Sequence, residues 1–91
     1  MIELEENRIK VSGKKLPKGD VDILKILIKN GPMTAHKISE MRGQIFDQYT
    51  QGRLRFLKSA VLDCIVVKSG SEYEINPEIK EELEEALKMI K

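Results

Sequence analysis

The residues of this chain best suited to nucleophilic, acid–base or metal chemistry are one histidine, His36, and one cysteine, Cys64. A nucleophile needs an activating base, and a zinc site needs at least three protein ligands. One histidine and one cysteine make up neither arrangement, and no glycine-rich phosphate loop or pair of carboxylates stands out. The sequence therefore predicts no enzyme activity, no metal site and no cofactor.

His36 and Cys64 each have a simple structural interpretation. A lone histidine can sense pH, but it is more often an ordinary surface side chain. Cys64 opens the apolar stretch "CIVV", which favours a buried and unreactive thiol. Because the chain has a single cysteine, it cannot form an intramolecular disulfide.

The remaining chemistry is that of charged hydrogen-bond donors, which gather in the stretch "GRLRFLK". Arg53, Arg55 and Lys58 could bind an anionic partner, or they could be the solvated surface of a helix. Tyr49 and Phe56 nearby could pack in the core or stack on a partner. The net charge of the chain is +1 at pH 7, so its total charge points to no class of partner.

The length of 91 residues suits one domain spanning residues 1–91. A composition of 41% hydrophobic and 34% charged residues is typical of a globular protein. We expect no secretory signal and no membrane span, because no apolar run is long enough for either. We therefore expect a cytoplasmic protein with no membrane partner.

The first thirteen residues alternate between apolar and polar positions, which predicts a β-hairpin over 1–13. Two strands alone are marginally stable, so this hairpin must lie on another part of the fold. Its apolar face consists of Ile2, Leu4, Ile9 and Val11.

A first helix is expected to begin at Asp20, a good N-cap residue, and to end at Asn30 and Gly31. Its apolar residues spread over roughly 220° of the helix surface at the usual helical period. An ordinary surface helix has a narrower apolar stripe. We therefore expect this helix to be covered on two sides.

A second helix follows at once, after Gly31 and Pro32 turn the chain. Thr34 is its expected N-cap, which leaves Met33 and Ile38 at the two positions of a hydrophobic staple. A staple fixes the direction in which a chain enters a helix. The sequence therefore predicts that the first two helices cross steeply.

The third helix is expected to begin near Asp47 or Thr50, and Gly52 weakens its first turns by about 1 kcal/mol relative to alanine. Two short strands, 65–67 and 73–75, follow around a tight glycine turn.

An amphipathic helix is predicted over 77–91, with Asn76 as its cap and Pro77 in its first position. Its apolar stripe contains Ile79, Leu83, Leu87 and Ile90. This stripe could pack back on its own domain or pair with a second subunit, and we expect a homodimer joined through it.

The stretches "ILKILIKNGPMTAHKIS", "GRLRFLKSAVLDCIVV" and "KSGSEYEI" give the order helix, sharp turn, helix, helix, strand–turn–strand. This order resembles the winged helix-turn-helix DNA-binding domain superfamily, of the type found in archaeal and bacterial transcription regulators. The resemblance implies an α+β, mainly α fold. It would place a winged-helix core at 20–76, with the hairpin and the last helix as additions.

The resemblance also implies a partner, double-stranded DNA, and a role as a sequence-specific transcription regulator. In this superfamily the third helix usually lies in the major groove and the wing touches phosphates. Carried over to this chain, the candidates for base contacts are Gln48, Thr50, Gln51, Arg53 and Arg55. The candidates for phosphate contacts are Lys37, Arg42, Lys58 and Lys68.

An alternative is a winged-helix module that binds other proteins in a larger assembly and does not read DNA. The near-zero net charge favours it. So do two acids in the predicted wing, Glu72 and Glu74, which stand against one basic residue, Lys68.

Overall fold

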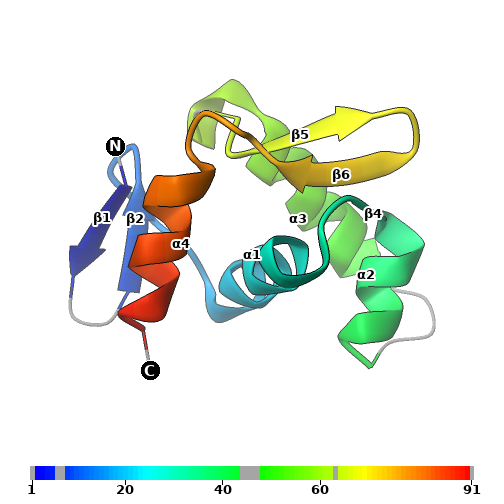
Figure 1. Ribbon diagram of the computed structural model, residues 1–91, viewed down its shortest axis with the longest axis horizontal. Coiled ribbons are helices and arrows are strands. Elements are labelled where there is room, and N and C mark those ends of the chain that lie inside the picture. Colours follow the sequence, from blue (N-terminus) through cyan, green and yellow to red (C-terminus); the bar gives the residue numbers. More distant parts are fainter. Residues whose placement is uncertain (1, 6–7, 44–47, 63, 91) are drawn as a thin grey trace.

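The computed structural model describes residues 2–5, 8–43, 48–62 and 64–90. Within these ranges the chain is an α+β fold of four α-helices, one short 3₁₀ helix (η1, Ala60–Leu62) and two three-stranded antiparallel sheets (Figure 1). The expected α+β class is confirmed.

The N-terminal sheet consists of β1 (Ile2–Glu5), β2 (Arg8–Val11) and β3 (Lys14–Lys15), in that order. Ile2 pairs with Val11 and Leu4 with Ile9, so the predicted hairpin is confirmed. The third strand was not predicted, because two lysines carry no strand signal of their own. They pair with β2 because the chain turns sharply at Ser12 and Gly13, which both have positive φ angles.

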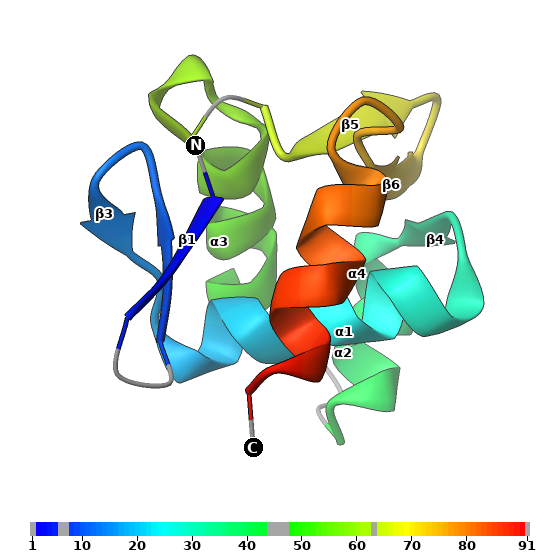
Figure 2. The same ribbon diagram turned by 60° about the vertical axis from the view of Figure 1, so that its left-hand side comes forward.

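The central element is α1 (Lys18–Asn30), which contacts α4 (Lys80–Lys88) on one side and α2 (Ala35–Met41) and α3 (Gln48–Lys58) on the other. In turn, α4 contacts β1, so the N-terminal sheet lies beside this helix (Figure 2). The expectation that the first helix is covered on two sides is confirmed.

The start of α1 differs from the prediction. Pro17 holds the N-cap position with φ −64°, and Asp20 lies inside the first turn, fully buried. Proline already has the φ angle that helix entry requires, so the helix begins after Pro17 without a side-chain cap. The Asp20 carboxylate is not used for capping and can pair with a side chain outside α1.

The turn between α1 and α2 follows the sequence signals closely. Gly31 has φ 80°, and its N–H donates to the Leu27 carbonyl at 2.9 Å. The Thr34 hydroxyl accepts from the Lys37 N–H at 3.1 Å, so the predicted N-cap is confirmed. In Figure 1, α1 is seen nearly along its axis while α2 runs across the view, so the two helices differ widely in direction.

The second sheet joins this turn to the C-terminal hairpin. Its strands are β4 (Met33–Thr34), β5 (Val66–Ser69) and β6 (Glu72–Ile75), in the order β4-β6-β5. Met33 pairs with Tyr73 and Thr34 with Glu72. The predicted hairpin is confirmed, whereas β4 was missed because two residues are too few to show a period.

Asp47, one proposed start of the third helix, lies outside the described residues.

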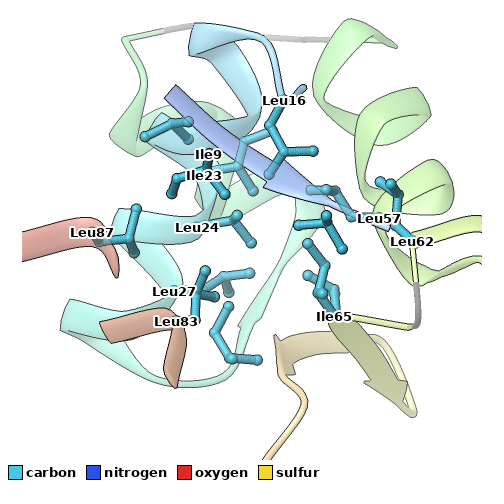
Figure 3. Packing of buried hydrophobic residues seen from close by; sticks show 14 of the residues in the cluster. Ile9, Leu16, Ile23, Leu24, Leu27, Leu57, Leu62, Ile65, Leu83 and Leu87 are labelled. Carbon is cyan, nitrogen blue, oxygen red and sulfur yellow. The ribbon is translucent and has the colours of Figure 1, made fainter. Parts of the chain in front are cut away.

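The core is continuous and mostly aliphatic (Figure 3), with Tyr73 as an aromatic member. Ile9 of the N-terminal sheet, Leu24 of α1 and Leu57 of α3 are all fully buried. Cys64 is only partly buried and has a positive φ of 50°, so the prediction that its thiol is buried was wrong. It lies in the turn before β5, where the Asn76 amide donates to its carbonyl at 3.0 Å.

The last helix begins later than predicted. Asn76 accepts from the Glu78 N–H at 3.0 Å and so stabilises a turn, and α4 starts only at Lys80. Ile79, Leu83 and Leu87 are buried within a single chain, and Ile90 is partly buried against the same core. This stripe is therefore not available to join two subunits. The homodimer itself stays a prediction.

The packing of α4 can be tested at Leu83, which is fully buried, against Met89, which is 68% exposed. Leu83→Ala should lower the free energy of unfolding by about 3 kcal/mol through lost burial and a cavity. Met89→Ala should change it by less than about 0.5 kcal/mol. Chemical denaturation measures both free energies of unfolding, and light scattering measures the oligomeric state of each variant. If Leu83→Ala separated a dimer into folded monomers, packing within one chain would be contradicted.

Candidate nucleic-acid interface

The outer face of α3 is the surface on which most of the predicted base contacts lie. Thr50, Leu54 and Leu57 point into the protein and are fully buried. Residues three or four positions apart share a helix face, so the opposite side carries Gln48, Gly52 and Arg55, all exposed. Gln51 and Lys58 lie at its edge; Gln51 is partly exposed and Lys58 is exposed.

This outer face carries no acid. The sequence of α3 contains two arginines, one lysine and two glutamines, and neither aspartate nor glutamate. Glutamine and arginine offer the paired donors and acceptors that recognise base edges in the major groove. The face therefore offers hydrogen-bonding groups that could meet base edges, with Arg55 as its positive charge and Lys58 at its edge.

Arg53 does not belong to this outer face. Its Nε donates to Asp20 Oδ1 at 2.7 Å, and its Nη2 donates to Asp20 Oδ2 at 2.6 Å. The guanidinium also lies over the Phe56 ring, 4.7 Å from its centroid. The prediction that Arg53 contacts bases is therefore corrected: it joins α3 to α1, with 26% of its side chain exposed.

Hydrogen bonding to Asp20 raises the pKa of Arg53 above its ordinary value, against the opposing effect of burial. Arginine is already protonated under all ordinary conditions. A further rise in the pKa means that the guanidinium of Arg53 stays charged, so pH near neutrality does not switch it.

Thr50 and Arg42 form a second link beneath α3. Thr50 is fully buried, and its hydroxyl accepts from Arg42 Nη1 at 2.7 Å. The prediction that Thr50 reads bases was therefore wrong. Arg42 lies 5.6 Å from the centroid of the Tyr49 ring.

A side chain at Gly19 would come within 2.9 Å of the Tyr49 hydroxyl, so a glycine lets α1 approach α3 closely here.

Three predicted phosphate contacts are exposed, one on α3 and two on elements next to it: Lys58 of α3, Lys37 of α2 and Lys68 of β5. Both α2 and β5 contact α3. In the described part of the chain, none of these lysines forms an ion pair with a carboxylate. Lys68 lies over the Tyr73 ring, 5.3 Å from its centroid.

Acids are present beside this surface but not on α3 itself. Glu72 is exposed and Glu74 partly buried on β6, and Glu40 is exposed on α2. The β5–β6 hairpin therefore has more negative than positive charge. The positive charge of the candidate interface comes mainly from Arg55 and Lys58.

Other kinds of site find no support among the described residues. No three side chains from histidine, cysteine, aspartate and glutamate come together as possible metal ligands there. His36 is exposed near the start of α2. No helix in these ranges has both the length and the apolar character needed to cross a lipid bilayer.

Three comparisons with known proteins were made for this chain. A scan against protein-family models, a search of curated proteins and a search of solved structures each gave no match.

Sequence reasoning missed the partner of Arg53. Asp20 lies 33 positions away from it along the chain, and its place near a helix start suggested a capping role. The sequence shows only an aspartate after a glycine near a helix start, and this becomes informative only when α3 is placed against α1.

The two arginines of α3 give a matched pair of tests. Arg53→Met should lower the free energy of unfolding by about 3 kcal/mol, because it leaves the buried Asp20 carboxylate without a partner. Arg55→Met should change it by less than about 0.5 kcal/mol, since Arg55 is exposed. Urea denaturation at neutral pH measures both.

A double substitution separates charge from packing. Replacing the pair together, as Asp20→Leu with Arg53→Met, should restore most of the lost stability, because no unpaired charge is then buried. Equal losses for Arg53→Met and Arg55→Met would contradict the structural role assigned to Arg53.

Proposed function

We propose that this protein is a winged helix-turn-helix regulator of transcription that inserts α3 into the major groove of double-stranded DNA. The arrangement of α1, α2 and α3, followed by the β5–β6 hairpin with β4 at its side, supports this proposal. The observation that carries it is the exposed, acid-free face of α3 with Gln48, Gln51 and Arg55.

The chemistry of each residue fits a distinct contact. Arginine can donate two hydrogen bonds to guanine, and glutamine can pair in the same bidentate way with adenine. Arg55, Gln48 and Gln51 are thus the candidates for reading bases. Lys58, Lys37 and Lys68 are the candidates for phosphate contacts, which set orientation and contribute no sequence preference.

The contacts beneath α3 support the same role. The Asp20–Arg53 pair and the Arg42–Thr50 hydrogen bond hold the helix from its inner side. A helix fixed in this way presents its outer residues without further ordering, which lowers the entropic cost of binding.

DNA binding can be measured by fluorescence anisotropy with a labelled duplex pool of randomised sequence, beginning at about 50 mM salt. We expect binding that weakens steeply as salt rises, because phosphate contacts release counterions. Phosphate contacts from Lys37, Lys58 and Lys68 would give a slope of log K against log salt of about −3 for each chain.

Two substitutions distinguish the roles on α3. Lys58→Ala should weaken binding to all sequences and reduce the salt slope by about one. Arg55→Ala should weaken a selected site by about 1–3 kcal/mol and relax its sequence preference at one position. Lys80→Ala, a lysine on α4, is the matched control and should change neither quantity.

A second candidate function is a protein-binding module without DNA readout. Met41 is 49% exposed and Tyr49 is 50% exposed, and large apolar side chains of this kind are common in protein interfaces. The acids of the β5–β6 hairpin also disfavour phosphate contacts there. Absence of any DNA binding at low salt would leave this function as the better supported of the two.

A further inference from the structure

Gly52 occupies an unusual place in α3. It lies inside the helix, with Gln48 one turn before it and Arg55 one turn after it on the same exposed face. This face is opposite the buried side formed by Thr50, Leu54 and Leu57. Gly52 is therefore at the middle of the proposed reading surface.

No contact described within the chain requires a glycine at this position. Gly52 lacks the positive φ that would favour glycine, and a side-chain carbon built on it would meet no described atom within 4 Å outside its own helical turn. Gly19 shows the contrast, because a side chain there would meet Tyr49 at 2.9 Å.

A glycine inside a helix carries a cost. It lowers the helix-forming equilibrium about fivefold relative to alanine, because the unfolded chain has more freedom to lose. Alanine would fit at position 52 and would stabilise α3. The cost of the glycine is therefore not explained by folding, whereas close approach of another molecule's surface is a known use of glycine.

We propose that Gly52 is the point at which the backbone of α3 comes closest to the DNA bases. This inference rests on the proposed function and adds to it a residue that determines specificity. Without a side chain at position 52, the helix lies deeper in the major groove. Gln48 and Arg55 then reach base edges on either side of the contact.

The test is Gly52→Ala, read out in two ways. Its melting temperature should rise by several degrees, because alanine favours the helix. Its affinity for the duplex that the wild-type protein selects from a randomised pool should fall by about tenfold or more, because one methyl group separates the helix from the bases. Gly52→Leu should abolish selection of that duplex while keeping salt-dependent binding to random DNA.

Met89→Ala is the control for both readouts, since Met89 lies on α4 and is exposed. It should leave the selected affinity unchanged. If the wild-type protein selects a duplex and Gly52→Ala binds it equally well, the role of Gly52 is overturned and the proposed function stands. If the wild-type protein binds no DNA, the proposed function fails and this inference fails with it.

Discussion

The ion pair between Asp20 and Arg53 fixes the orientation of α3, and the character of the outer surface depends on that orientation. Both oxygens of a fully buried carboxylate accept hydrogen bonds from one edge of a guanidinium. Such a bidentate pair sets direction as well as distance. A small rotation of α3 would break it and leave a buried charge without a partner, so the face with Gln48 and Arg55 is held outward.

The apolar surface of α1 is the second constraint. A domain of this size has few residues from which to build a core. One wide apolar helix packs against α2 and α3 on one side and against α4 on the other, and α4 in turn contacts β1 of the N-terminal sheet. The N-terminal sheet and α4 thus complete the core around α1. The outer face of α3 is not needed for the core and stays exposed to solvent and to binding partners.

Charge in this chain is divided between structure and surface. Arg53 and Arg42 are engaged with Asp20 and Thr50, whereas Arg55 and Lys58 remain exposed on the outer side of the same helix. The net charge of the chain cannot distinguish these two groups of basic residues, because a paired arginine and an exposed arginine each count as +1. The local arrangement decides which positive charges a partner can meet.

Elements that depend only on neighbouring residues could be predicted from the order of the amino acids. The cap at Thr34, the stop at Gly31 and the hairpin turn after Ser69 follow from backbone hydrogen bonds and φ angles within a few residues. The tertiary structure alone decided that Arg53 is held by Asp20, that Thr50 is buried, that β4 joins the second sheet and that Leu83 packs within its own chain. Each of these outcomes joins segments far apart along the chain, and a periodic pattern shows which face of an element is apolar but not which surface will cover it.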